Sequence, residues 1–195
     1  MYAVGSMGWR MAGQKAQADG QAALISIEGQ LGVDPAGGPD AQRQFRQTLG
    51  QFATGVTVMT CMGPNGSRIG VTVNSFTSLS LNPPLIMWAL ADSSANFGSF
   101  EAGAPFAVNV LSIDQEQAAR QFATPAGDKF ANIDIHEGID GVPLIVGCVA
   151  YLECRTEARY PGGDHEIIVG RVRRVFNIAR RPLLFHGGQF HVPHL

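Results

Sequence analysis

Residues 70–80 read GVTVNSFTSLS, a β-strand pattern that continues into a run of hydroxyl side chains. Apolar Val71 and Val73 alternate with polar residues, so one face of the strand packs and the other presents hydrogen-bonding groups. Gly70 would let the backbone approach a ligand closely. Such a surface suits a flat, apolar ligand whose edge carries donors and acceptors. An edge strand followed by a Ser/Thr-rich loop gives the same pattern without a ligand.

Further strand-like runs lie on both sides of this stretch. They are expected at residues 56–62, 69–75, 85–91, 105–111, 148–156, 166–175 and 183–186, with a short return through Phe190. No G-x-G-x-x-G motif follows a strand, and the strands are not joined by regular helical crossovers. The sequence therefore predicts a mainly β fold, an antiparallel β-barrel with a few short helices, and not a doubly wound parallel sheet.

Two amphipathic helices are expected in addition to a short one near residue 93. The first begins with Asp40 as N-cap and ends at Gly55, because Phe45, Leu49 and Phe52 share one face at i, i+4 and i+7. The second begins at residue 112, where Ser112 and Gln115 have the spacing of a capping box.

Composition excludes several classes of protein. The 195 residues are 45% hydrophobic and 15% charged, with a net charge of −2, so neither nucleic acid nor an anionic membrane is expected as a partner. No apolar run is long enough to span a bilayer, and no secretory signal is recognised. The cysteines Cys61, Cys148 and Cys154 lie in apolar runs and are odd in number, which favours buried free thiols and a cytoplasmic location.

Residues 1–39 differ from the rest of the chain. They are rich in Gly, Ala and Gln, and PAGGP at 35–39 is typical of a flexible linker. We expect two parts, a flexible extension over 1–39 and one globular domain over 40–195.

Two more motifs indicate a binding site. Ser93 or Ser94 would cap a short helix whose apolar face is Phe97 and Phe100, and free N–H groups at a helix start suit a phosphate. A plain N-cap explains the same residues. Gly-Asp-His at 163–165 follows a turn and stands at the mouth of the next strand, where a histidine is available to a ligand.

The order of these motifs resembles the flavin reductase-like, FMN-binding split-barrel family, the small reductase components of two-component flavin monooxygenases. The similarity runs from Phe45 to about Phe190. It rests on FATGVTV at 52–58, NSFTSLSLNPPL at 74–85, FAVNVL at 106–111, GDH at 163–165 and PLLF at 182–185. The resemblance implies an antiparallel Greek-key split barrel. Val73 departs from the family pattern, in which a smaller residue is common.

The resemblance also implies a site by position. The flavin ring is expected against residues 70–75 and 89–91, its phosphate near 93–96, and the nicotinamide beside 163–165. His165 is the catalytic candidate, no metal is expected, and a metal at His191-x-x-His194 is the less favoured interpretation of the C-terminal histidines. The expected cofactor-binding residues are Gly70, Val71, Thr72, Asn74, Ser75, Phe76, Thr77, Ser78, Ala89, Leu90, Ala91, Ser93, Ala95, Asn96, Gly163, Asp164 and His165.

The function that the resemblance implies is NAD(P)H:flavin oxidoreductase. A hydride passes from NADH or NADPH to FMN or FAD, and reduced flavin is supplied to a separate monooxygenase. The family is typically a homodimer with flavin sites at or near the subunit interface. Three alternatives stay open: a non-catalytic flavin-binding or electron-transfer protein, a reductase that holds its flavin tightly and serves another acceptor, and a β-barrel interaction domain without a cofactor.

Overall fold

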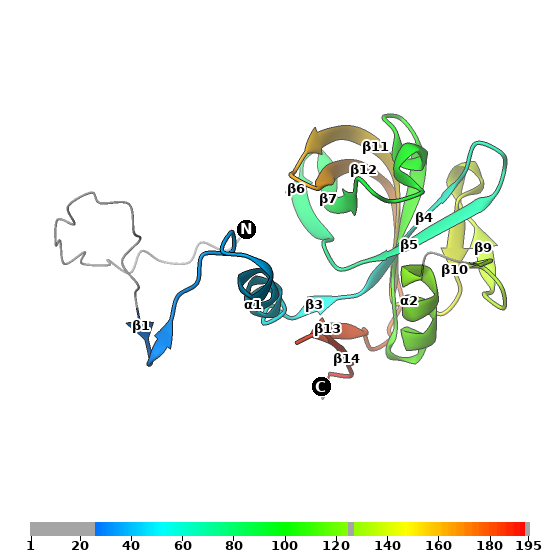
Figure 1. The fold of residues 1–195 in the computed structure, drawn as a ribbon. Helices are drawn as coiled ribbons and strands as arrows, with labels where there is room; N and C mark the ends of the chain where they lie inside the picture. Colours follow the sequence, from blue (N-terminus) through cyan, green and yellow to red (C-terminus); the bar gives the residue numbers. More distant parts are fainter. Residues whose placement is uncertain (1–25, 125–126, 194–195) are drawn as a thin grey trace. The chain divides into compact units, whose positions relative to one another are not determined.

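The computed structural model describes residues 26–124 and 127–193. The chain divides into two compact units, one up to Gln44 and one from Phe45 onward, and Figure 1 draws the whole chain as a ribbon. In the first unit, strands β1 (Ser26–Ile27) and β2 (Gln30–Leu31) form a short antiparallel pair. Residues 1–25, which hold most of the expected extension, lie outside the described residues.

The first helix is shorter than its sequence pattern predicts. Helix α1 (Pro39–Leu49) begins with a proline, which suits the first helical position because an N–H there has no partner inside the helix. The expected end at Gly55 is wrong. Residues Thr54–Gly55 form strand β3, which pairs with β13 (Leu184–His186) and holds the backbone extended. Phe52 therefore lies beyond the helix and is 79% exposed.

Seven strands make the main sheet, in the order β5–β4–β8–β11–β12–β7–β6, and every neighbouring pair is antiparallel. This arrangement confirms the mainly β, antiparallel fold. The strands are β4 (Thr57–Met62), β5 (Arg68–Val73), β6 (Thr77–Leu81), β7 (Pro84–Ala91), β8 (Pro105–Val110), β11 (Ala150–Pro161) and β12 (His165–Asn177).

The sheet curls into an open barrel. Its two edge strands, β5 and β6, are joined only by residues 74–76. Four residue steps span at most about 14 Å, so the two edges meet at this corner. Figure 1 shows β6, β7, β11 and β12 curving around one another. Strand β6 was not among the expected strands: its hydroxyl side chains lie on an edge strand that pairs with β7.

Apolar side chains gather in two cores. The barrel interior holds Trp88, Phe100 and Phe106, and the rings of Trp88 and Phe100 meet edge to face with centroids 4.9 Å apart. The second core includes Phe122 and Leu144 and brings side chains of helix α2 (Glu116–Ala123) together with those of β10 (Pro143–Ile145). The barrel is therefore filled, and ligands must bind at its surface or its rims.

Short elements complete the fold. The 3₁₀ turn η2 (Ile113–Gln115) leads into α2, and its Ser112–Gln115 capping box is confirmed. Strand β9 (Ile135–Glu137) pairs with β10 around the turn η3 (Ile139–Gly141), and β14 (Gln189–His191) pairs with β13. The 3₁₀ turn η1 (Phe97–Phe100) follows β7. Within the described part of the chain, no helix is long and apolar enough to cross a bilayer.

Candidate active site

Pairing between β7 and β12 brings two of the predicted segments together. Ala91 lies opposite His165 and Ala89 lies opposite Ile167. Paired residues of an antiparallel sheet share a face, and Leu90 between the alanines is buried in the barrel core. The alanines, Ile167 and the imidazole therefore lie on the outer face, where each is half-buried. We call these four residues the outer platform: small and apolar along most of its length, with a histidine at one end.

The link between β5 and β6 borders this platform. The ladder between β6 and β7 stops at Thr77 opposite Met87. Two residues further along β7, the Ser75 hydroxyl takes the place of a strand: Ala89 N–H donates to Ser75 Oγ at 3.0 Å, and Ser75 Oγ donates to the Ala89 carbonyl at 3.2 Å. Ser75 thus fixes the exposed link 74–75 beside the platform.

His165 is paired with its neighbour. Its Nδ1 lies 2.7 Å from Asp164 Oδ1, and the hydrogen bond and the charge of His165 lower the pKa of the Asp164 carboxyl. An ionised carboxylate only accepts hydrogen bonds, so the proton between the two groups sits on Nδ1. This orientation leaves Nε2 available to a ligand, and the side chain is 45% exposed.

The turn after β7 is tied to the same corner. Asp92 N–H donates to the Asp164 carbonyl at 3.1 Å, which joins the turn to the Gly-Asp-His segment. The expected serine cap is wrong in detail: η1 has Asn96 at its N-cap position without a side-chain cap, and Ser94 Oγ instead accepts from Asn96 N–H at 3.3 Å. Ser93 and Ala95 are exposed on this turn.

Other predicted site residues face away from the outer platform. Gly70 packs against helix α2, because a Cβ at this position would lie 2.4 Å from the Phe122 ring. Thr72 Oγ1 donates to the Ala119 carbonyl of the same helix at 2.7 Å. Val71 packs against the barrel core. These packing and hydrogen-bonding contacts explain the presence of the three residues at these positions without any ligand.

The remaining predicted residues lie in the link after β5, at the start of β6 and in the turn before β12. Asn74, Thr77 and Ser78 are exposed, and Phe76 is half-buried against the barrel core. Gly163 adopts φ +81° in the turn between β11 and β12, a conformation that favours glycine. Cavities of 170, 360 and 410 Å³ lie elsewhere, and none is lined by a predicted site residue. Because the platform residues are half-buried and Asn74, Thr77 and Ser78 are exposed, the candidate site lies on an open face of the single chain.

Sequence reasoning missed one cluster at this corner. Arg159 of β11 forms an ion pair with Glu166, and its guanidinium carbon lies 4.3 Å from the centroid of the Phe97 ring. Its Nη1 also donates to the Phe97 carbonyl at 3.2 Å. Only the pairing register of β11 and β12 reveals this cluster. Once the turn at 162–164 is known, Arg159 is expected opposite Ile168, two residues from Glu166.

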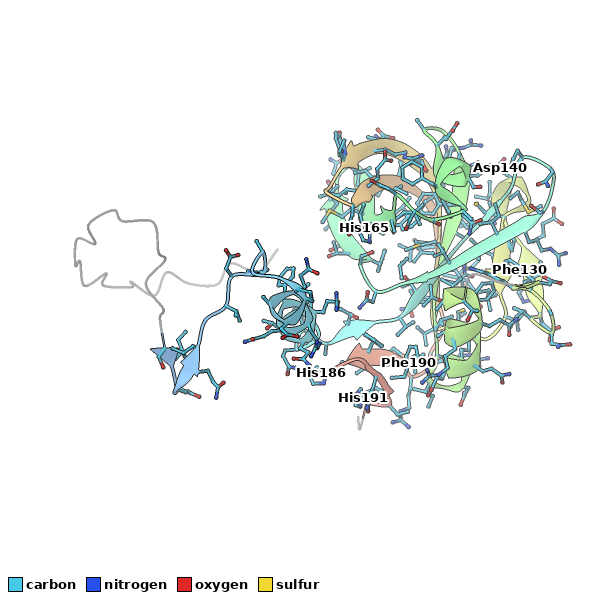
Figure 2. All side chains as sticks on the ribbon, in the orientation of Figure 1. Phe130, Asp140, His165, His186, Phe190 and His191 are labelled. Carbon is cyan, nitrogen blue, oxygen red and sulfur yellow. The ribbon has the colours of Figure 1, made fainter. Side chains whose placement is uncertain are left out.

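The C-terminal histidines do not join this site. Figure 2 shows His165 apart from His186 and His191, which lie on the β13–β14 hairpin. The His186 and His191 rings have centroids 5.9 Å apart, and His191 Nε2 lies 3.1 Å from the His186 carbonyl. His194 lies outside the described residues. Across residues 26–124 and 127–193, no group of three or more His, Cys, Asp or Glu side chains is arranged to hold a metal.

Comparison with known proteins connects this geometry to a family. The family model described as "flavin reductase like domain" matches residues 49–193 of the chain. The chain is 46% identical over 153 residues to the FMN reductase (NADH) of Agrobacterium fabrum, a match that covers 78% of this chain and 87% of that protein. It is 40% identical over 149 residues to the reductase subunit of a flavin-dependent monooxygenase of Rhodococcus jostii, with 76% of each chain covered.

A solved structure agrees with these sequence matches. The NADH:FAD oxidoreductase of Streptomyces globisporus, in complex with NAD and FAD fragments, superposes with a TM-score of 0.75 at 42% identity. That match covers 82% of this chain and 94% of the other. The matched region includes the seven barrel strands, the outer platform and the Gly-Asp-His turn. The chain therefore belongs to the flavin reductase-like family.

Proposed function

We propose that this chain is an NADH-dependent flavin reductase that passes a hydride from the nicotinamide to FMN or FAD. The observation that carries the proposal is the outer platform, on which Ala89 and Ala91 share a face with the His165 imidazole. Two small side chains leave room for a flat ring, and the histidine stands where a second ring would stack on it. The named activities of the Agrobacterium and Streptomyces relatives support the same chemistry.

The chain's own contribution to the reaction is orientation. Hydride transfer from nicotinamide C4 to flavin N5 is chemistry that the two bound molecules supply. Hydroxyl and amide groups of the 74–78 segment pair the polar edge of the flavin ring, as burial of that edge requires. His165, held by Asp164, offers Nε2 to the nicotinamide carboxamide or to the dinucleotide phosphates. Stacking and alignment lower the barrier, and no general acid is needed.

The flavin phosphate is assigned to the turn 93–96. The hydroxyls and N–H groups of this turn follow the platform directly along the chain, so one flavin molecule is able to contact both. The remaining predicted residues Gly70, Val71, Thr72 and Leu90 support the site from behind, through α2 and the barrel core. Residues 40–195 are proposed as the reductase domain and residues 1–39 as a flexible extension.

A homodimer completes the proposal. The outer platform lies on an open face of a single chain, whereas bound ligands of this size are usually buried over most of their surface. A second copy placed against this face would supply the missing cover. We further propose a cytoplasmic protein. Its reduced flavin would be delivered to a separate monooxygenase, as the name of the Rhodococcus relative, a monooxygenase reductase subunit, suggests.

One assay tests the function. Loss of NADH absorbance is followed with purified protein, with and without excess FMN or FAD, and again with NADPH. We expect turnover with NADH that rises and saturates as free flavin is added. Turnover that is independent of added flavin, by a protein that is yellow as purified, would instead indicate tightly held flavin. No turnover with either nicotinamide would contradict the proposal.

A further inference from the structure

Arg159 connects the phosphate turn to the strand that carries His165. Its Nε forms the ion pair with Glu166, the residue after His165, and its Nη1 donates to the Phe97 carbonyl at 3.2 Å. The flat guanidinium also covers the Phe97 ring at 4.3 Å. One side chain thus contacts the end of the turn 92–97 and the start of β12 together.

The Arg159 guanidinium lies on the inner face of the barrel, near the ends of β11 and β12. Arg159 lies opposite Ile168, which is fully buried in the barrel core, and paired residues share a face. Glu166 lies on that same face because it is two residues from Ile168. The Arg159 and Glu166 side chains are only 16% and 24% exposed. The outer platform and this ion pair therefore lie on opposite faces of the same strand ends.

Stability alone is a poor explanation for this pair. Burying two charges costs desolvation energy. A protein with apolar residues in place of a buried ion pair is often as stable as the original or more stable. Arg159 Nη2 is buried and has no hydrogen-bond partner among the described residues, which adds a further cost. What the arrangement does provide is geometry, since the planar guanidinium fixes a carbonyl, a ring and a carboxylate at once.

We propose that Arg159 is a positioning residue that sets the turn 92–97 for the phosphate of the flavin and so favours FMN and FAD over riboflavin. The inference rests on the proposed function, because it concerns the flavin substrate. The turn is anchored at its other end by the Asp92–Asp164 backbone hydrogen bond. With Arg159 in place, both ends of the turn are held; without it, the end at Phe97 loses its polar anchor.

The test compares binding of FMN and riboflavin, which differ only in the phosphate, by quenching of flavin fluorescence. In Arg159→Met we expect the Kd for FMN to rise about tenfold and the Kd for riboflavin to change less than about twofold. Glu166→Gln, which removes the charge that anchors Arg159, is expected to shift the same ratio in the same direction. At saturating FMN, kcat is expected to stay within about twofold, because the platform is intact.

Arg171→Met is the matched control. Arg171 pairs with Glu157 across the same two strands, and its guanidinium hydrogen bonds go to Glu157 and not to the turn. We expect it to leave both dissociation constants unchanged. Equal weakening of FMN and riboflavin in Arg159→Met, or no weakening, would overturn the inference, and so would a wild-type protein that binds both flavins equally.

The two proposals fail separately. Binding is measured without NADH, so a wild-type chain that prefers FMN but oxidises no nicotinamide would contradict the reductase and leave the role of Arg159 supported. If Arg159→Met does not fold, Glu166→Gln decides alone, because its amide keeps the shape of the carboxylate. An unchanged FMN-to-riboflavin ratio in Glu166→Gln would then overturn the role of Arg159.

Discussion

At the residue scale, the proposed nicotinamide site depends most on the side chain of His165. Its ring is oriented through the Asp164 hydrogen bond to Nδ1, whereas the platform beside it is apolar. We expect His165→Ala to raise the KM for NADH about tenfold, the effect of losing one hydrogen bond to a charged or polar group, while the Kd for FMN changes little. Steady-state kinetics and a flavin titration measure the two quantities.

His136→Ala is a suitable control for that substitution. His136 is an exposed histidine on β9, outside the site. It is expected to leave both constants unchanged. A His165→Ala protein with the wild-type KM for NADH would remove His165 from the nicotinamide site.

Gly70 makes a prediction about packing at the same scale. A methyl group there would overlap the Phe122 ring at 2.4 Å in a buried contact. We expect Gly70→Ala to lower the free energy of unfolding by about 1–3 kcal/mol, as overpacking of a filled core does. Urea denaturation measures this change. Gly55→Ala is the control, since nothing lies within 4 Å of a Cβ at Gly55.

A second substitution shows whether the ring is the cause. Phe122→Leu in the Gly70→Ala background shortens the side chain that a methyl group would strike. The double variant is expected to lose less stability than the two single losses added together. Simple additivity would mean that Gly70 is required for another reason, such as approach to a ligand.

At the scale of elements, Glu153 holds the β9–β10 hairpin on the sheet. Its buried carboxylate on β11 accepts from Ile139 N–H in η3 and is paired with Arg174 of β12. Burial alone would raise the pKa of this carboxyl, but the hydrogen bonds from Arg174 and Ile139 and the charge of Arg174 together lower it below 4.5. The folded state therefore favours the ionised form.

The pH dependence follows from that direction. A pKa that is lower in the folded than in the unfolded state stabilises the protein above the unfolded value, near 4.5, and this stabilisation is lost as the pH falls through the folded value. We expect Glu153→Gln to be less stable than wild type by about 1–3 kcal/mol at pH 7 and the gap to narrow below pH 4.5. Chemical denaturation at both pH values measures it. A gap of constant size would exclude the ionised carboxylate as its cause.

The elements also show what the sequence is able to predict. Most strongly patterned strands were found near their true bounds: β7 was expected at 85–91 and lies at Pro84–Ala91. The long strand β11 was expected to end at 156 but continues to Pro161. Strand β6 was missed because its hydroxyl-rich run suggests a loop, although Leu79 and Leu81 alternate with serines. Both leucines are exposed on the edge strand, 49% and 90%. The predicted end of α1 was wrong because the apolar residues keep a helical spacing as far as Phe52. The backbone of Thr54–Gly55 instead pairs with β13, which is distant in the sequence.

The candidate site divides in a similar way. Motif order singled out the segments 89–91, 93–96 and 163–165, and strand pairing with one backbone hydrogen bond brings them together; their roles in binding stay a prediction. Sequence order alone could not show that Gly70 and Thr72 face helix α2, because that depends on where the helix packs. Nor could it show the contacts of Arg159, because Phe97 is distant in the sequence and Glu166 lies across a hairpin.

At the scale of the whole molecule, the barrel separates support from binding. Its interior is filled by aromatic and aliphatic side chains, with the Arg159–Glu166 pair at one mouth. Its outer face carries the alanines of β7 and the histidine of β12. Under the proposed function, a flat substrate binds on the outside of this filled barrel, and such a surface needs cover from elsewhere to exclude water.

That cover leads to the last prediction, which concerns assembly. If a second copy lies against the outer platform, the protein in solution has twice the 20.8 kDa mass of the chain, as light scattering would measure. Dilution would then lower the dimer fraction and the affinity for FMN together, because each site depends on the partner for its cover. The two curves are expected to have the same midpoint concentration. A monomer that binds FMN and turns over NADH fully would contradict a site at the interface. If the dimer dissociates on dilution but the affinity for FMN does not change, the subunit contact lies away from the platform.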